Sequence, residues 1–317
     1  MQMFMSYYMQ SKKISHKKAF AFSITMWIIA SILFATVVIL RFAKDEVKLS
    51  QGLKDKLQTQ MRVLSVLESL KFYVPTADYT FTSLKNSLLS DIEYPLPSEI
   101  IVDGREYNIS KNISFSLRDT SSMLHVMYGS SEMIAKSLTT HSTNDLSSML
   151  KDSLDDWRDE DNLVRSNGKE QNSYASSDKK IIVRNTRAIQ DIHELKLING
   201  FEKIDIRTIK SNLYYGRGSS INLMLISNQR YLASLLEVDE NFMLKMLELR
   251  ENEPLLFRKN ISGLKAFNDD YMGFWLARQF LIEIVATEGS AKSILDVTMN
   301  FKVLNERPYI TVSFMLK

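Results

Sequence analysis

Residues 20–40 read FAFSITMWIIASILFATVVIL and contain no charged side chain. At about 1.5 Å of rise per residue, a helix of this stretch is about 31 Å long, which matches the hydrocarbon core of a bilayer. Four lysines precede it and no acidic residue does, a pattern typical of the cytoplasmic side of a span: Lys12, Lys13, Lys17 and Lys18. The sequence therefore predicts a basic cytoplasmic leader (1–19) and a single transmembrane helix (20–42), with the rest of the chain on the far side.

The composition of the 317 residues is that of a folded protein, with 45% hydrophobic and 24% charged side chains. A net charge of +3 is too small to indicate a nucleic-acid partner, and the absence of cysteine excludes disulfides and thiolate metal sites. The apolar run exceeds the about 7 to 15 residues of a secretory signal, and no small-x-small cleavage site follows it before Arg41. From the residues alone, we expect an uncleaved membrane anchor.

The helix is predicted to continue beyond the membrane to about Leu70. Apolar residues recur there every three or four positions between polar ones, as on an amphipathic helix. We call them the leucine stripe, and we expect this stripe to pack on the protein's own sheet: Leu49, Leu53, Leu57, Met61, Leu64 and Leu67.

Strand patterns occupy two separate regions of the chain. Residues 99–102 and 105–108, with Asp103 and Gly104 between them, predict a hairpin, and residues 112–117 alternate apolar and polar side chains. Near the C-terminus, residues 274–286 form an apolar run, and residues 292–303 with 309–316 predict a terminal antiparallel pair.

Helical periodicity fills the region between the two groups of strands, most clearly at residues 133–138, 146–157, 189–197 and 228–249. A helical block between two β blocks indicates an inserted domain, because strands from both ends can complete one sheet. We therefore predict an α+β fold in which a long N-terminal helix packs on a small antiparallel sheet and carries an inserted helical domain. The predicted parts are 43–120 and 266–317 for the sheet domain and 121–265 for the insert.

The densest group of charges is the acidic run from Asp155 to Asp161. Carboxylates at close spacing suit a hard cation such as calcium, which takes six to eight oxygen ligands. The run does not match an EF-hand, because no glycine stands at the sixth position after Asp159. On the run alone, a solvated helix end leading into the polar loop 166–180 is the favoured interpretation.

No catalytic pattern emerges from the sequence. The histidines at 16, 125, 141 and 193 are scattered and form no HExxH pair, so zinc is not indicated. Residues 215–219 (YGRGS) lack the lysine of a phosphate-binding loop, and no GxSxG nucleophile elbow occurs. We expect a protein that is not an enzyme.

Residues 156–174, DWRDEDNLVRSNGKEQNSY, resemble the signature of the type II secretion system protein K family, the large minor pseudopilin. The stretches 114–126 (SFSLRDTSSMLHV), 191–201 (DIHELKLINGF) and 219–223 resemble further segments of that family in the same order. Eight residues of the signature fall at the family's spacing: Asp156, Trp157, Asp159, Asp161, Arg165, Gly168, Glu170 and Tyr174.

The resemblance implies a calcium site in the helical insert, and so makes a calcium site the favoured interpretation of the acidic run. It assigns the ion to Asp159, Asp161 and Glu170, with Asp156 nearby, and gives it a structural role in holding the loop 166–180. We hypothesise that Asp161→Ala abolishes calcium-dependent thermal stabilisation.

The resemblance also implies a place in a secretion fibre. It predicts a subunit anchored in the inner membrane with its body in the periplasm, which joins minor pseudopilins of the I and J type, the major pseudopilin and the inner-membrane platform. Prepilin peptidase would cut between Ala19 and Phe20, where alanine replaces the family's usual glycine. Ile24 stands where major pseudopilins carry a glutamate, a feature of protein K that fits a subunit at the fibre tip.

The alternative is a bitopic inner-membrane protein whose periplasmic domain binds calcium and another partner, or is a hydrolase that uses Asp159 and Glu170 as paired carboxylates. A full-length mass in the membrane and a monomeric periplasmic domain would favour this alternative.

Overall fold

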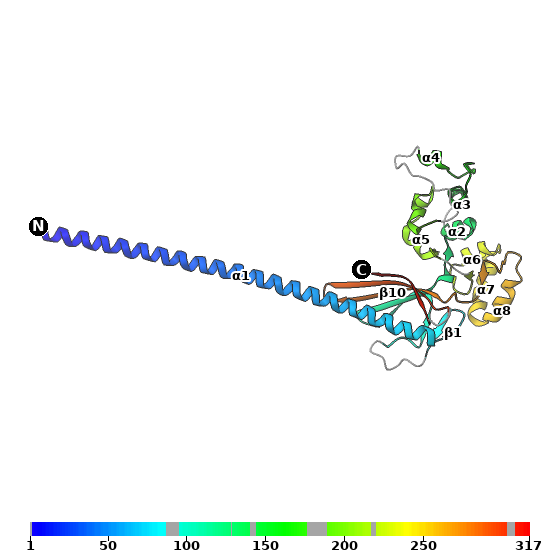
Figure 1. The fold of residues 1–317 in the computed structure, drawn as a ribbon, viewed down its shortest axis with the longest axis horizontal. Helices are drawn as coiled ribbons and strands as arrows, with labels where there is room; N and C mark the ends of the chain where they lie inside the picture. Colours follow the sequence, from blue (N-terminus) through cyan, green and yellow to red (C-terminus); the bar gives the residue numbers. More distant parts are fainter. Residues whose placement is uncertain are drawn as a thin grey trace. The chain divides into compact units, whose positions relative to one another are not determined.

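The computed structural model describes residues 2–86, 95–127, 129–139, 144–175, 189–216, 220–302 and 308–317. Figure 1 shows their helices and strands in chain order. The chain divides into two compact units, residues 1–60 with 287–292 and residues 61–286 with 293–317, which are described separately below.

The first unit is dominated by the N-terminal part of α1, a continuous helix from Gln2 to Thr76. The helix predicted from residue 20 to about Leu70 is therefore confirmed. Within the described residues it is the one helix long and apolar enough to cross a membrane, with a mean hydropathy of 2.4 in its most apolar window. The tip of a hairpin, residues 287–292, belongs to the same unit, where Lys56 Nζ donates to the Lys292 carbonyl at 2.7 Å.

In the second unit, the last turns of α1 pack on a sheet through a different face from the one predicted. The side chains that enter this core are Val63, Val66, Leu67, Leu70, Tyr73 and Val74. The leucine stripe is mostly exposed: apart from Leu67, its side chains expose between 39% and 66% of their surface. The prediction that this stripe packs on the sheet is wrong. The face that is buried includes Val63, which precedes Leu64 by one residue and therefore points about 100° away from it around the helix axis.

The sheet of this unit has five strands in the order β12-β11-β10-β5-β4. Their bounds are β4 Asp103–Ser110, β5 Ile113–Asp119, β10 Gln279–Glu288, β11 Ala291–Asn300 and β12 Ile310–Leu316. Alternate residues of β5 are buried, as its pattern predicted, because one face of the strand covers the core. The predicted antiparallel pair at the C-terminus is confirmed as β11 with β12, and its predicted turn at residues 305–308 lies largely outside the described residues.

The hairpin predicted across Asp103 and Gly104 does not form, although both of its strands do. β3 (Glu99–Ile101) pairs with β2 (Ser83–Lys85), which pairs with β1 (Asp78–Tyr79), while β4 pairs with β5. The two strands belong to different sheets because the chain bends between them: the Val102 amide donates to the Thr82 carbonyl, and the Val102 carbonyl accepts from the Asp119 amide.

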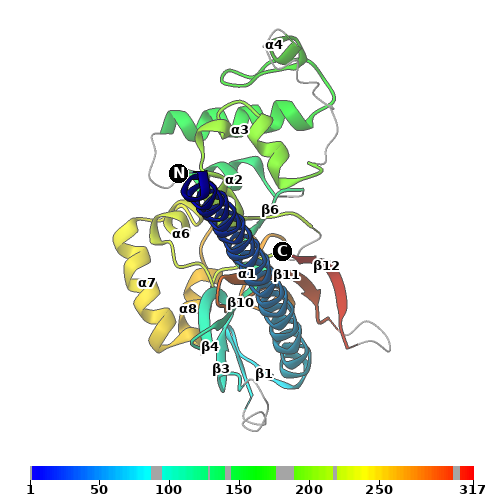
Figure 2. The same ribbon diagram turned by 90° about the vertical axis from the view of Figure 1, so that its left-hand side faces the viewer.

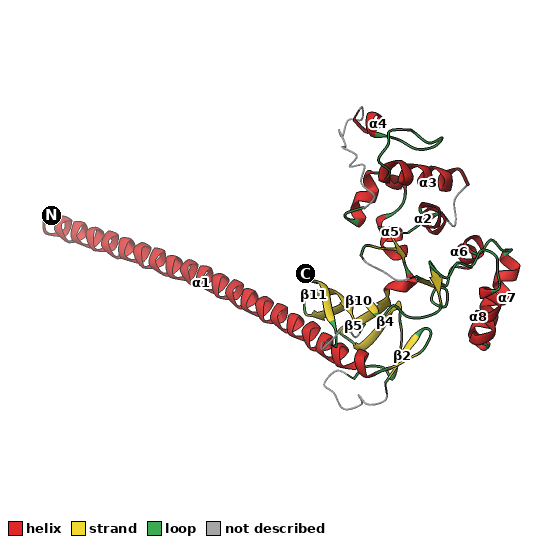
Figure 3. Cartoon of the chain, turned by 45° about the vertical axis from the view of Figure 1, so that its right-hand side comes forward, coloured by secondary structure: helices red, strands yellow, loops and turns green. Residues whose placement is uncertain are grey.

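A helical domain is inserted between two neighbouring strands of the five-stranded sheet. β5 ends at Asp119 and the next strand in the sheet, β10, begins at Gln279, whereas the sequence pattern predicts the return at residue 266. Figure 3 shows the strands of the sheet gathered together and the helices of the insert grouped apart from them. The predicted α+β architecture, a long helix on a small antiparallel sheet with a mainly helical insert, is confirmed.

The insert is built from short helices around a second hydrophobic core. Figure 2 shows α7 and α8 side by side. The helices are α2 Ser131–Leu138, α3 Asn144–Arg158, α4 Gln171–Ala175, α5 Ile206–Asn212, α6 Gln229–Leu235, α7 Glu240–Asn252 and α8 Pro254–Ser262. The described part of the insert also contains three 3-10 turns and two short parallel pairs of strands. The turns are η1 Thr120–Ser122, η2 Ile192–Leu197 and η3 Phe201–Lys203, and the pairs are β6 Leu124–His125 with β7 Leu213–Tyr214 and β8 Ile221–Asn222 with β9 Met272–Gly273.

Two predicted helices of the insert differ from those observed. The segment 228–249 is interrupted between α6 and α7, where Glu237 has a φ of 53° and the Asp239 carboxylate caps α7 by accepting from the Asn241 amide. The segment 189–197 forms the 3-10 turn η2 rather than an α-helix.

Candidate metal centre

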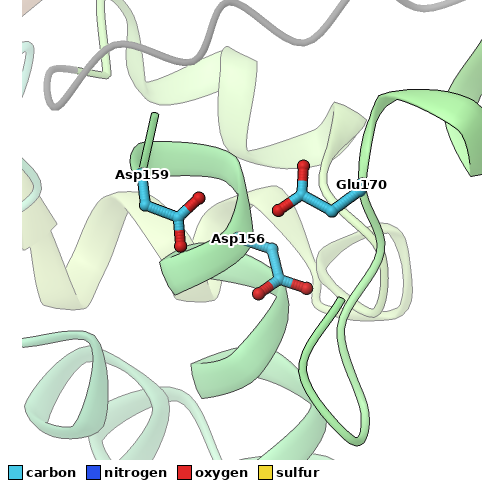
Figure 4. Close-up of side chains that lie close together, drawn as sticks. All are labelled: Asp156, Asp159 and Glu170. Carbon is cyan, nitrogen blue, oxygen red and sulfur yellow. The ribbon is translucent and has the colours of Figure 1, made fainter. Parts of the chain in front are cut away.

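Three carboxylates meet at the C-terminal end of α3. Asp156 lies in the last turn of α3, Asp159 directly follows the end of that helix, and Glu170 comes from the loop that leads into α4, as Figure 4 shows. One oxygen of each lies within 4.8 Å of the others. Asp156 is fully buried and Glu170 exposes only 2% of its surface, so this group is not a solvated surface cluster.

The aromatic residues of the signature hold these two segments together. Trp157 is buried in the core of the insert, and its ring meets that of Tyr174 edge to face with centroids 5.3 Å apart. Trp157 Nε1 donates to Glu194 at 2.8 Å, and the Tyr174 hydroxyl accepts from the Asn199 amide at 3.0 Å. Because these contacts fix the end of α3 and the helix α4 to residues 194–199, they bring Glu170 close to Asp156.

Gly168 allows the loop to cross directly over Asp156. A Cβ atom at this position would stand 1.9 Å from Asp156 Oδ2 and 3.1 Å from the Asp152 carbonyl oxygen. Any other residue would force the loop away from the carboxylate. The glycine of the signature is thus required by the close approach of the loop to Asp156.

Arg165 bridges Asp156 and Asp159 at the end of α3. Its Nη1 lies 2.6 Å from Asp156 Oδ1 and 2.5 Å from Asp159 Oδ2. The hydrogen bonds that the guanidinium donates to Asp159 and to Asp156 raise its pKa, so it remains a cation. One positive charge therefore faces three carboxylates.

Glu170 is left without such a partner. Neither of its buried carboxylate oxygens has a hydrogen-bond partner among the described residues, and the buried Asp159 Oδ1 also lacks one. Burial first, and then the negative charges of Asp156 and Asp159, raise the pKa of Glu170. A buried acid in a negative environment is costly unless a proton or a cation neutralises it. An all-oxygen donor set with unpartnered atoms fits a hard cation such as calcium.

The other predicted site residues lie outside this group. The exposed Asp161 carboxylate accepts a hydrogen bond from the Leu163 amide at 2.8 Å. Ala19 and Phe20 lie within α1, and Phe20 exposes 69% of its surface. The assignment of Asp161 as a ligand and of the 19–20 bond as a cleavage site both remain predictions.

Sequence reasoning missed the role of Arg158, whose place among five acids suggested a solvated side chain. Its guanidinium instead turns inward and donates to the carbonyls of Val126 and Gly129, the latter at 3.0 Å. Burial lowers the pKa of Arg158 to about 10, against the opposing effect of Asp155. Arg158 thereby ties the end of α3 to the loop that precedes α2, a contact that no local pattern could predict.

Known proteins resemble this chain over part of its sequence and in its fold. Residues 130–213, which include the carboxylate group, match the family model described as type II secretion system (T2SS), protein K. A search of curated proteins gives no match.

The chain also resembles a chain in the crystal structure of the GspK-GspI-GspJ complex of the type 2 secretion system from enterotoxigenic Escherichia coli. The two share 13% sequence identity with a TM-score of 0.50, and the match covers 87% of this chain and 99% of that one. At this identity, the likeness concerns the fold.

The helical insert therefore contains a region, residues 130–213, that matches the protein K family of the type II secretion system, and the chain as a whole has a fold similar to that of a chain in the GspK-GspI-GspJ complex.

Proposed function

We propose that this chain is the tip subunit of the secretion fibre: it starts and caps the periplasmic pseudopilus and so supports export of folded proteins across the outer membrane. The observation that carries this proposal is the insertion of residues 120–278 between β5 and β10. A small helix-and-sheet domain is a repeating unit that can stack, whereas a helical block of this size on one subunit suits an end position.

The proposed partners are minor pseudopilins of the I and J type, because the structurally similar chain comes from a GspK-GspI-GspJ complex. Ile24 supports an end position as well. With isoleucine at this position, the membrane segment lacks a carboxylate. A subunit inside the fibre would use that carboxylate to bind the N-terminal amine of its neighbour. The major pseudopilin and the inner-membrane platform are the further proposed contacts.

We also propose the placement of the chain in the cell. The helix α1 anchors it once in the inner membrane, with Lys12, Lys13, Lys17 and Lys18 on the cytoplasmic side and the sheet and insert in the periplasm. Prepilin peptidase is the enzyme proposed to remove residues 1–19.

Calcium is the proposed ion at the carboxylate group, held by Asp156, Asp159 and Glu170 with Asp161 as a fourth ligand. It would neutralise the buried Glu170 and compete with Arg165 for the oxygens of the two aspartates. Its role would be structural, since it would fasten the loop after α3 to the end of that helix.

Co-purification from the native membrane tests the proposal. The tagged full-length chain should bring down I-type and J-type pseudopilins in a defined complex, and a strain that lacks the chain should retain exoproteins in the periplasm. If the chain elutes alone and secretion is normal without it, the bitopic envelope protein described above becomes the better account.

A further inference from the structure

Arg258 on α8 is enclosed by three aromatic rings at the surface of the second unit. Its guanidinium carbon lies 5.2 Å from the ring centroid of Phe81, 5.3 Å from that of Phe274 and 4.9 Å from that of Trp275. Contacts of this length are favourable cation–π interactions. They hold the guanidinium in one position, although the arginine side chain has many rotamers in solution.

The rings are themselves held in place. Phe274 is buried, stacks on Phe267 with centroids 5.6 Å apart, and meets Phe257 edge to face. Phe81 packs against Trp275 at 4.9 Å, and its carbonyl accepts a hydrogen bond from the buried Asn222 side chain at 3.2 Å. The cage is therefore a preorganised part of the fold and not a loose surface contact.

The charge of Arg258 is not neutralised within the described part of the chain, where no carboxylate forms an ion pair with it and its buried Nε has no hydrogen-bond partner. Arg165 and Arg105, by contrast, pair with aspartates at 2.7 Å or less. Aromatic faces attract a cation but leave the N–H groups at the edge of the guanidinium available for an acceptor. A carboxylate is the acceptor that matches this edge, through two parallel hydrogen bonds.

Exposed apolar side chains lie beside Arg258. Trp275 exposes 62% of its surface, and Leu255, one turn before Arg258 on the same face of α8, exposes 68%. We call these three residues the Arg258 surface. A rigid arginine next to an exposed tryptophan has the composition of a hot spot in a protein–protein interface.

We propose that the Arg258 surface receives an acidic side chain of a protein partner, whose carboxylate pairs with Arg258 while an adjacent apolar group covers Trp275. A protein acid fits better than a phosphate group, because phosphate sites gather several arginines or lysines, whereas this cage presents a single guanidinium beside apolar surface. This inference goes beyond the fibre-tip proposal, because it concerns the chemical group of a protein partner that this surface recognises. It does not depend on the chain being the subunit at the fibre tip.

The test uses the full chain in detergent, labelled with 5-fluorotryptophan. The chain has three tryptophans, so the fluorine spectrum should hold separate signals for Trp27, Trp157 and Trp275, with the last assigned by Trp275→Phe. The probes are the capped peptide Gly-Glu-Gly, its uncharged analogue Gly-Gln-Gly, and inorganic phosphate. We expect the glutamate peptide to shift the Trp275 signal saturably in the millimolar range, while the glutamine peptide leaves it in place.

Variants assign the effect to the guanidinium. Arg258→Met should abolish the shift, and Arg258→Lys, which keeps the charge but loses the paired hydrogen bonds, should weaken binding about tenfold. Arg207→Met, at an arginine whose side chain is 91% exposed, should bind as the native chain does. The Trp157 signal reports whether each variant keeps the fold of the insert.

Three results would overturn the proposal: a Trp275 signal that the glutamate peptide does not move, one that both peptides move equally, or one that phosphate moves as far as the glutamate peptide. The comparison of the two peptides on the native chain stands even if Arg258→Met fails to fold.

Discussion

The buried carboxylate of Asp119 accepts a hydrogen bond from the backbone amide of Arg278 at 2.9 Å. Asp119 is the last residue of β5, where the chain leaves the sheet for the helical insert, and Arg278 immediately precedes β10, where the chain returns. The same carboxylate accepts from the Ala277 amide at 3.0 Å and from the Ser121 amide at 2.8 Å. One side chain thus joins both ends of the insert.

Replacing Asp119 should destabilise the protein strongly. Asp119→Ala leaves buried amides of Ala277 and Ser121 without an acceptor, and we expect a loss of about 3 kcal/mol in the free energy of unfolding. Asp103→Ala is the matched control, since its carboxylate forms its ion pair with the half-exposed Arg105 two residues away, and it should change stability by less than about 0.5 kcal/mol. Urea unfolding of both variants in detergent measures the difference, and equal midpoints would disprove the role of Asp119.

Calcium should raise the melting temperature of the native chain in proportion to the logarithm of its concentration above the dissociation constant. Glu170→Gln should abolish this rise, because it removes the charge of a carboxylate whose two buried oxygens have no hydrogen-bond partner among the described residues. Scanning fluorimetry with calcium and with a chelator measures both. A rise that persists unchanged in Glu170→Gln would exclude the site.

The same assay decides on the fourth proposed ligand. We expect Asp161→Ala to lose the calcium response, as the family resemblance implies, although the Asp161 carboxylate is engaged with the Leu163 amide in the structure. A full response in Asp161→Ala would restrict the ligands to Asp156, Asp159 and Glu170 without affecting the site itself.

Gly168→Ala should move the loop that carries Glu170. Its new methyl group would overlap Asp156 Oδ2, so we expect a loss of about 1–3 kcal/mol and a weakened calcium response. The control is Gly263→Ala, where the nearest atom to an added Cβ is the Asn260 oxygen at an ordinary 3.5 Å. Equal melting curves for the two variants would mean that the loop does not pass over Asp156 as described.

Stability should also depend on pH through His125. This residue is buried against the ring of Tyr214, and burial lowers its pKa below the ordinary value of 6.5. As the pH falls below 6.5, the histidine is therefore protonated in the unfolded chain before it is protonated in the folded one. The free energy of unfolding then decreases by up to about 1.4 kcal/mol per pH unit.

His125→Phe should flatten this dependence, because a phenyl ring keeps the edge-to-face contact and cannot be protonated. Unfolding free energies between pH 5 and 7 provide the measurement. A native chain whose stability does not change below pH 6.5, or a His125→Phe variant with the native slope, would contradict this assignment.

The elements that the sequence predicted well are those governed by local periodicity. α1 and β5 each carry an uninterrupted pattern, so their existence and type followed from it. The pairing of β3 was not predictable in this way, because its partner β2 and the bend at Val102 depend on contacts outside the local turn signal.

The candidate site shows the same division. The grouping of Glu170 with Asp156 and Asp159 came from the family resemblance, while on local pattern alone the acids looked solvated. The contacts that hold the site together join residues far apart in the chain: Trp157 donates a hydrogen bond to Glu194, and Arg158 donates one to the Gly129 carbonyl. The link between Asp119 and Arg278 spans 159 positions and has no local signature.

The central claim, that the chain acts as a pseudopilin, is tested most directly by the intact mass and N-terminal sequence of the protein purified from its native membrane. The account predicts a chain that begins at Phe20, with a methylated N-terminal amine, after removal of residues 1–19. A chain that begins at Met1 would show a permanent anchor and would contradict the proposed processing and assembly into a fibre.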